Sequence, residues 1–377
     1  MILSAKTEYR FGGKPFLAQV VDGSTASSAP REQQVRMKLR DVAGTPTRCR
    51  ELSWVDRSDG SARSVNLPAE MDYLQTGDIV RLSPSGGTIR VLYRRASRHN
   101  VLFFTERCNS RCLMCSQPPR AVEDGYLVDE ILEMIPWMAK TTPELGITGG
   151  EPTLLGPRLI EVIEQVKAHL PDTALHMLSN GRLFRYLRYA ERVAAVRHPN
   201  FMIGIPLYSD TAALHDYVVQ AQDAFDQTLL GLLNLGRTGV RIEIRMVIHR
   251  ETFSRLPEFA RFVVRNLPFV DQVVLMGLEP TGFARSNLDA LWIDPFDYQE
   301  QLETCVSELA AGGLTVGIYN HPLCLLRPSL RGYARQSISD WKNIYLPECE
   351  RCSVKSRCAG FFASAESRHS SHVRAVA

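Results

Sequence analysis

Apolar and polar positions alternate regularly between residues 101 and about 280, where short apolar runs are followed by segments with an apolar stripe at helical spacing. The segments 127–140 and 159–166 each gather their apolar residues on one helix face, and 225–235 and 256–264 continue the pattern. This alternation predicts βα repeats around a mainly parallel sheet. The six predicted strands, two fewer than a closed eight-unit barrel has, are 101–105, 144–148, 174–178, 202–207, 241–248 and 272–276.

The first part of the chain has a different pattern, with short β-type runs and no helical period. The runs 78–82 and 88–93 flank Ser83-Pro84-Ser85-Gly86-Gly87, which predicts a hairpin, and further β-type runs are 16–21 and 34–39. We expect a small β domain, which either caps the next unit or grips a substrate or partner through an exposed sheet edge. Residues 94–100 look like a linker.

These patterns divide the chain into four parts. We expect an α/β protein with a small β domain over 1–98, a βα core over 99–290, a C-terminal extension over 291–363 and a disordered polar tail over 364–377.

Composition adds little to this picture. Of 377 residues, 45% are hydrophobic and 23% are charged, as in an ordinary globular protein, and the net charge is only +3. That charge does not indicate a nucleic-acid partner, and the arginines between 182 and 188 are expected on a solvated helix face, with an acidic ligand as the alternative. No apolar run of about 18 residues or secretory signal pattern occurs. We therefore expect a cytoplasmic protein without a membrane partner.

Cysteines carry the first candidate chemistry. Three of the nine, Cys108, Cys112 and Cys115, lie within eight residues directly after the first predicted core strand. A [4Fe–4S] cluster held by three thiolates leaves one iron open for another ligand. The spacing therefore indicates a cluster with chemistry of its own, whereas Cys49 and Cys305 are expected to be buried, unliganded side chains.

A second group of cysteines occurs in the C-terminal third. Cys324, Cys349, Cys352 and Cys358 provide four thiolates, which make a closed coordination set. Zinc could occupy such a set tetrahedrally, and an iron–sulfur cluster is the alternative.

Further polar motifs follow the predicted strands. Gly149-Gly150-Glu151-Pro152 follows the second strand, Ser179-Asn180-Gly181 the third, Tyr208-Ser209-Asp210 the fourth and Gly277 the sixth. Because ligands gather at the carboxyl ends of parallel strands, we expect these motifs and the first cysteine group at one end of the sheet.

Together, Cys108, Cys112, Cys115 and Gly149-Gly150-Glu151 resemble the radical S-adenosylmethionine (SAM) superfamily, whose core is a partial (β/α)6 barrel. The resemblance implies that a [4Fe–4S] cluster binds SAM and cleaves it to methionine and a 5′-deoxyadenosyl radical. It also implies contacts of Gly149, Gly150 and Glu151 with the methionine amino group, of Ser179 and Asn180 with the ribose or carboxylate, of Arg245 with the carboxylate, and of Met276 and Gly277 with the adenine. Met114 replaces an aromatic residue that is often found before the third cysteine, so a thioether would pack against the adenine.

The later cysteines add a second resemblance. Their Cys-x2-Cys-x5-Cys spacing after such a core is similar to SPASM/twitch extensions, which favours a second, auxiliary [4Fe–4S] cluster over zinc.

Longer stretches resemble one family in particular, the His-Xaa-Ser system radical SAM maturase of the HxsC type. The resemblance implies post-translational modification of a small peptide that carries His-Xaa-Ser repeats, with a partner radical SAM maturase and an electron donor such as flavodoxin or ferredoxin. The alternatives are a radical SAM enzyme acting on a small molecule or RNA, and a non-catalytic iron–sulfur or zinc protein. The stretches are 108–120, 145–156, 175–183, 204–210, 225–237 and 319–325.

Overall fold

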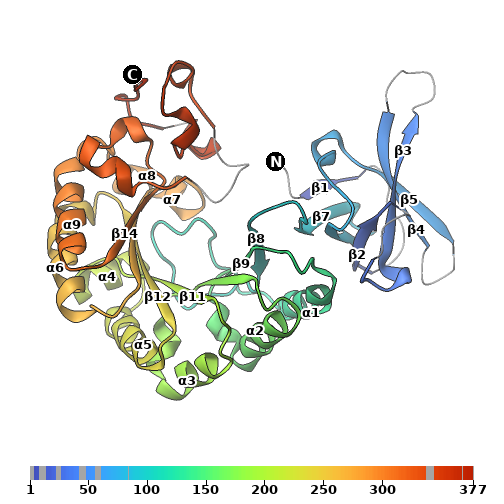
Figure 1. Ribbon diagram of the computed structural model, residues 1–377, viewed down its shortest axis with the longest axis horizontal. Helices are drawn as coiled ribbons and strands as arrows, with labels where there is room; N and C mark the ends of the chain where they lie inside the picture. Colours follow the sequence, from blue (N-terminus) through green and yellow to red (C-terminus); the bar gives the residue numbers. More distant parts are fainter. Residues whose placement is uncertain are drawn as a thin grey trace.

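The structure, a computed structural model, describes residues 4–7, 14–22, 27–41, 48–55, 61–83, 85–336, 344–366 and 368–376. Two seven-stranded sheets organise these residues, one near the N-terminus and one in the centre of the chain (Figure 1). Among the described residues, no helix has both the length and the apolar character that a bilayer span requires.

The N-terminal sheet confirms the predicted small β domain. Its strands lie in the order β1-β7-β6-β2-β3-β4-β5, and β6 and β7 form the predicted antiparallel hairpin. Ala18, Val20, Val35 and Leu52 are fully buried in a core that belongs to this sheet. The strand bounds are β1 Ser4–Lys6, β2 Phe16–Val21, β3 Gln34–Asp41, β4 Arg48–Val55, β5 Ala62–Asn66, β6 Ile79–Ser83 and β7 Thr88–Tyr93.

The central sheet is parallel throughout, with its strands in sequence order from β8 at one edge to β14 at the other. Figure 1 shows this sheet curled into an open barrel wall, with the helices along its outer side. The strands are β8 Asn100–Phe103, β9 Glu144–Thr148, β10 Ala174–Leu178, β11 Phe201–Pro206, β12 Arg241–Ile248, β13 Gln272–Gly277 and β14 Thr315–Tyr319. The main helices are α1 Tyr126–Met134, α2 Pro157–His169, α3 Leu187–Ala195, α4 Ala212–Val219, α5 Ala224–Thr238, α6 Leu256–Asn266 and α9 Gln299–Ala311.

Side-chain alternation explains why the wall is covered on one side only. In β12, Ile242, Ile244 and Met246 are buried in the main core, while Glu243 and Arg245 occupy the alternate positions. Successive side chains of a strand point to opposite faces, so the polar pair lies on the concave side of the wall.

The wall has one strand more than the sequence predicts. Beyond the predicted core boundary at residue 290, α9 packs against α6 and β14 pairs in parallel with β13. The six predicted βα units are all present, and β14 adds a seventh strand to them. The residues of β14 fall within the range that the sequence assigns to the C-terminal extension.

The C-terminal tail, predicted to be disordered, is placed against the chain through residue 376, with only residue 367 outside the description. Arg368 pairs with Asp289 at 2.8 Å, and its guanidinium lies 4.5 Å from the centre of the Trp292 ring. His372 stacks on Phe296 with ring centres 3.9 Å apart. Cation–π and stacking contacts order this polar segment, although it has few apolar side chains.

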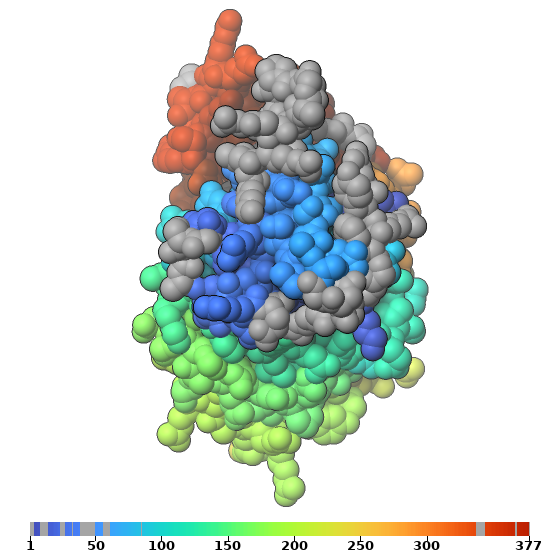
Figure 2. All heavy atoms as spheres, turned by 90° about the vertical axis from the view of Figure 1, so that its right-hand side faces the viewer, coloured from blue at the N-terminus to red at the C-terminus, as the bar shows by residue number. Residues whose placement is uncertain are grey.

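The two sheets are joined through a shared core. Tyr93, the last residue of β7, is buried in the same hydrophobic cluster as the barrel helices, and its hydroxyl lies 2.8 Å from Thr142 Oγ1. The same hydroxyl accepts a hydrogen bond from the backbone N–H of Ala139. Gln19 of β2 donates to the Trp137 carbonyl at 2.8 Å. Figure 2 looks onto the outer face of the β domain, with barrel residues in green below it and C-terminal residues in orange and red above it.

Because of these contacts, we expect Tyr93→Phe to destabilise the protein. The change leaves the part-buried N–H of Ala139 without its acceptor and the buried Thr142 hydroxyl without one of its partners, which costs about 1–3 kcal/mol of unfolding free energy. Thermal unfolding measures the loss. The matched control is Tyr186→Phe on an exposed residue, whose hydroxyl accepts a hydrogen bond from Arg185. An unchanged midpoint in Tyr93→Phe would contradict a role for this hydroxyl in docking.

Candidate metal and cofactor site

The loop that carries the first cysteine group begins at the carboxyl end of β8 and is anchored by one buried carboxylate. Asp124 accepts hydrogen bonds from the Thr105 hydroxyl at 2.7 Å and the Glu106 backbone at 2.6 Å. It also pairs with Arg107 at 3.1 Å. The loop therefore starts from a fixed point directly before Cys108.

Cys108, Cys112 and Cys115 are free thiols that converge at the end of this loop. Burial, followed by the charge of the neighbouring Cys115 and Cys108 thiolates, raises the pKa of Cys112 to about 12. Burial and the nearby Glu151 carboxylate raise the pKa of Cys108 to about 11. Raised pKa values favour the neutral thiols, and the positive charge of a bound metal centre would favour the thiolates instead.

The donor set fits an iron–sulfur cluster. Within the described residues, no three or more His, Cys, Asp or Glu side chains are arranged to hold a single metal ion. A cubane cluster makes a different demand, since each thiolate binds a different iron. Cys108, Cys112 and Cys115 would hold three irons of such a cluster.

The glycine pair after β9 lets two backbones pack together. A Cβ atom on Gly149, whose φ is +143°, would lie 2.5 Å from the Thr105 carbonyl oxygen, and one on Gly150 would lie 2.0 Å from that of Arg107. Both distances are closer than van der Waals contact allows. In the structure, Gly150 N–H donates to Thr105 O at 2.7 Å and Glu151 N–H donates to Arg107 O at 2.8 Å. The pair thus fixes the cysteine loop against the end of β9.

Glu151 is fully buried and its carboxylate is surrounded by donors. One oxygen accepts from the backbone and hydroxyl of Thr153 and from the Ser179 hydroxyl at 2.8 Å, and the other accepts from the Asn180 backbone at 2.6 Å. Burial raises the pKa of Glu151, and these hydrogen bonds oppose the shift. The carboxylate ties the end of β9 to the end of β10. The predicted contact between Glu151 and the SAM ammonium stays a prediction.

The motif after β10 reaches the cysteine loop. Asn180 Nδ2 lies 2.6 Å from Asn109 Oδ1 and 3.9 Å from Cys108 Sγ. Ser179 is buried, and its hydroxyl lies between Glu151 and the Gly181 backbone N–H. Both predicted residues therefore lie beside the first cysteine group, while their contacts with SAM stay predictions.

Sequence reasoning missed Arg182. It was expected on a solvated helix face, yet its guanidinium donates to the Asn109 carbonyl and to the Ser110 hydroxyl, the latter at 3.1 Å. Burial lowers the pKa of Arg182, and the charge of Cys108 opposes the shift. The sequence feature that could have indicated its place at the site is its position directly after Asn180-Gly181, at the end of a predicted strand.

Arg245 lies on the concave face, as its strand position predicts, and is already paired. Its guanidinium contacts Glu243 at 2.7 Å and Met276 Sδ at 3.2 Å. Although burial alone would raise the pKa of Glu243, His176 and Arg245, together with Gln272, lower it to about 2. A Cβ on Gly204 would lie 3.1 Å from both Arg245 Cδ and His176 Nε2, so this glycine leaves room for the polar cluster. The contact between Arg245 and the SAM carboxylate stays a prediction.

Met114 and Gly277, which were predicted to contact the adenine, both lie in tightly packed surroundings. Met114 is buried in the main core. A Cβ on Gly277 would lie 2.6 Å from the Asn320 carbonyl oxygen, so the glycine permits the approach of the turn after β14. Tyr208, which follows the fourth predicted strand, is buried near the cysteines, whose charges add to burial in raising its pKa.

The second cysteine group also converges. The charges of Cys358 and Cys349 add to burial in raising the pKa of Cys324, and those of Cys358 and Cys352 do the same for Cys349. Backbone N–H groups point at the sulfurs, from Leu323 to Cys358 at 3.3 Å and from Val376 to Cys352 at 3.4 Å. The tail therefore contacts this group.

The two remaining cysteines lie apart from both groups. Cys305 is fully buried in α9, as expected. The side chain of Cys49 lies outside the described residues.

Solved structures similar to this chain have low sequence identity to it. Streptococcus suis SuiB bound to S-adenosylmethionine shares 15% identity at a TM-score of 0.48, over 59% of this chain and 50% of that chain. Native anSMEcpe with bound AdoMet shares 17% identity at a TM-score of 0.45, over 58% of this chain and 62% of that chain. A radical SAM methyltransferase from Sphaerobacter thermophilus shares 13% identity at a TM-score of 0.42, over 75% of this chain and 76% of that chain. The match thus spans about half the length of SuiB.

Sequence comparison gives the firmer result. No curated protein matches the chain. The family model of the Radical SAM superfamily matches residues 102–263, which run from β8 into α6 and include the first cysteine group, the glycine pair and Asn180. Residues 102–263 are therefore a radical SAM domain.

Proposed function

We propose that the chain is a radical SAM enzyme that modifies a peptide. A radical SAM domain implies a [4Fe–4S] cluster and SAM as cofactors. When bound, the cluster supplies one electron to the SAM sulfonium, so that the C5′–S bond breaks to give methionine and a 5′-deoxyadenosyl radical. With that chemistry supplied, a peptide carbon held beside the site would lose a hydrogen atom to the radical, which would become 5′-deoxyadenosine.

One observation carries this proposal: three separate motifs meet at one end of the barrel wall. The cysteine loop after β8, the glycine pair after β9 and Asn180 after β10 are joined by backbone and side-chain hydrogen bonds. Cys108, Cys112 and Cys115 hold the cluster. The proposed SAM contacts are Gly149, Gly150, Glu151, Ser179, Asn180, Arg245, Met114 and Gly277, and Glu151 also holds the turns after β9 and β10 together.

The peptide class rests on sequence resemblance. Six stretches between residues 108 and 325 resemble the His-Xaa-Ser system maturase of the HxsC type. The proposed substrate is therefore a peptide with His-Xaa-Ser repeats, modified together with a partner radical SAM maturase and an electron donor such as flavodoxin or ferredoxin. The open barrel wall supports a peptide substrate, because its edge strand β8 is not closed by β14.

The second cysteine group is proposed to hold an auxiliary [4Fe–4S] cluster. The supporting observations are the mutual approach of Cys324, Cys349 and Cys358 and the backbone N–H groups directed at Cys352 and Cys358. Such N–H···S contacts are common around cluster sulfurs and tune reduction potential.

We expect Cys112→Ala to lose SAM cleavage. After anaerobic reconstitution and reduction with dithionite, the wild type should form 5′-deoxyadenosine, and the variant should form none because one iron loses its thiolate. Liquid chromatography measures the product. Cys305→Ala, which changes a buried thiol outside both groups, is the control and should retain the reaction. Wild-type protein that contains the cluster and makes no 5′-deoxyadenosine would refute the radical SAM activity.

Iron analysis of the same samples tests the auxiliary cluster. We expect about eight irons in the wild type and about four each in Cys112→Ala and Cys352→Ala, as for two cubane clusters. About four irons with one zinc in the wild type would instead establish the zinc alternative.

Glu151→Gln should weaken the site without removing any cysteine. The new amide directs a donor at the N–H and O–H groups that now meet a carboxylate, which lowers stability by about 1–3 kcal/mol. The rate of 5′-deoxyadenosine formation should fall about ten- to hundred-fold, as expected when reacting groups are misplaced. The control is Glu161→Gln on the exposed side of α2. A full rate in Glu151→Gln would show that the turns keep their places without the carboxylate.

The peptide substrate is tested by mass spectrometry. A synthetic His-Xaa-Ser repeat peptide, incubated with the enzyme, its partner maturase, SAM and reductant, should change mass, and the change should require Cys112. A peptide with alanine in place of each repeat histidine is the control. Formation of 5′-deoxyadenosine without any change in peptide mass would leave the SAM chemistry standing and favour a small-molecule or RNA substrate.

A further inference from the structure

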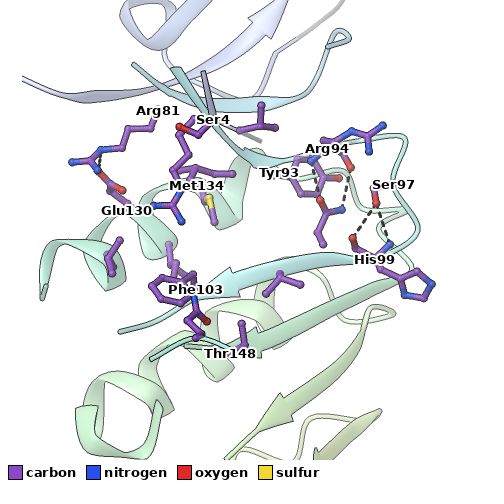
Figure 3. Close-up of a pocket in the computed structure, with 18 of the residues that line it drawn as sticks. Ser4, Arg81, Tyr93, Arg94, Ser97, His99, Phe103, Glu130, Met134 and Thr148 are labelled. Carbon is purple, nitrogen blue, oxygen red and sulfur yellow. Dashed lines mark hydrogen bonds and ion pairs between the residues drawn. The ribbon is translucent and has the colours of Figure 1, made fainter. Parts of the chain in front are cut away.

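A cavity of about 650 Å³ lies between the β domain and the barrel wall. Figure 3 shows its walls, with Arg81 and Tyr93 from the β domain on one side and Phe103, Glu130 and Met134 on the other. Its volume is in the range of ligand-binding sites. The β domain therefore meets the barrel without filling the space between them.

One wall of this cavity is an unpaired strand edge. The central sheet ends at β8, and no strand of the described residues pairs with the outer side of β8. In a parallel ladder, alternate residues direct both backbone polar groups to the same neighbour. Since Phe104 N–H donates to Thr148 O on the β9 side, the backbone groups of Val101 and Phe103 face outward. Val101 is 47% exposed, and both residues line the cavity.

The cavity lining includes direct sequence neighbours of the candidate site. Strand β8 leads within five residues from Phe103 to Cys108. Ser116 and Gln117, which follow Cys115, line the cavity, as does Thr148, which precedes Gly149. An extended chain that lies along β8 would therefore run toward the cysteine loop.

The charged and apolar side chains of the cavity walls indicate what kind of segment could bind there. Arg81 is paired with Glu130 at 2.9 Å. Arg90 is exposed, and its guanidinium lies 5.9 Å from the centre of the Phe103 ring. Its charge acts on the Glu130 carboxylate from beyond ion-pair distance, so that among the described residues Arg81 is the direct partner of Glu130. Leu127, Ile131 and Met134 add apolar surface from α1. These walls suit an apolar segment that carries an acidic side chain.

We propose that an extended, acidic segment of the peptide substrate binds in this cleft as an added strand on the outer edge of β8, with its carboxylate on Arg90. Backbone hydrogen bonds to Val101 and Phe103 would fix the direction of the segment, as in other cases of strand addition. The inference rests on the proposed peptide-modifying function and gives that peptide a binding site.

Hydrogen exchange resolved to single amides tests the added strand. The probe is a synthetic His-Xaa-Ser repeat peptide preceded by an apolar segment with two aspartates, added to the reconstituted full-length enzyme. Exchange should slow at Val101 and Phe103, whereas Leu102, whose N–H faces β9, is the internal control and should not change. Peptide binding with no protection at Val101 and Phe103 would overturn the proposed site.

Charge reversal gives the second test. Arg90→Glu should weaken binding of the aspartate peptide about fivefold, the upper range for one exposed ion pair, and should not weaken binding of the matching asparagine peptide. Arg36→Glu, on an exposed position of β3 in the same sheet, is the matched control and should bind both as the wild type does. Equal effects of the two variants would overturn the role of Arg90.

The outcomes separate the two proposals. A peptide that is modified without protection of the β8 edge leaves the proposed function standing and rejects the cleft. A peptide that is neither modified nor bound rejects both.

Discussion

The buried Glu151 carboxylate is the interaction on which the site depends. A carboxylate without water or partners would be strongly unfavourable in this position, so its hydrogen-bond donors are a requirement of the fold. Thr153, Ser179 and Asn180 supply them from the turns after β9 and β10. Any displacement of one turn would leave part of the carboxylate unpaired. The carboxylate therefore fixes the turn after β9 relative to the turn after β10.

The two turns in turn hold the cysteine loop in place. Gly149 and Gly150 admit the loop backbone on the β9 side, and Asn180 and Arg182 hold Asn109 on the β10 side. On the far side, Phe283 N–H donates to the Cys115 carbonyl at 2.8 Å. Contacts from several separate segments thus bring the three thiols together.

The pattern of apolar and polar residues predicted the elements that depend on residues close together in the sequence. The predicted bounds of β9, β10 and β12 agree with the structure because β9 and β10 are short, largely apolar runs between turn residues and β12 alternates polar with apolar residues at the period of a strand. In contrast, β4 and β5 were missed because Arg48–Val55 and Ala62–Asn66 mix polar and apolar residues. Arg182 was missed because its partners are Asn109 and Ser110, about seventy residues away. The candidate residues could be named from the sequence, whereas the contacts that give Arg182 and Glu151 their roles could not.

The sequence left two roles open for the β domain, a structural cap and a grip on the substrate. The structure is compatible with both roles at once. A domain that served only as a cap would be expected to fill its interface, because protein interiors are close-packed and open space forfeits dispersion contacts. Here Tyr93 is buried and hydrogen-bonded in the shared core, yet it also lines the cavity of about 650 Å³ beside β8. The residue that joins the β domain to the barrel is therefore also part of the cavity wall. A gap next to an open strand edge is a feature that a peptide-binding cleft requires and that a simple cap would lack.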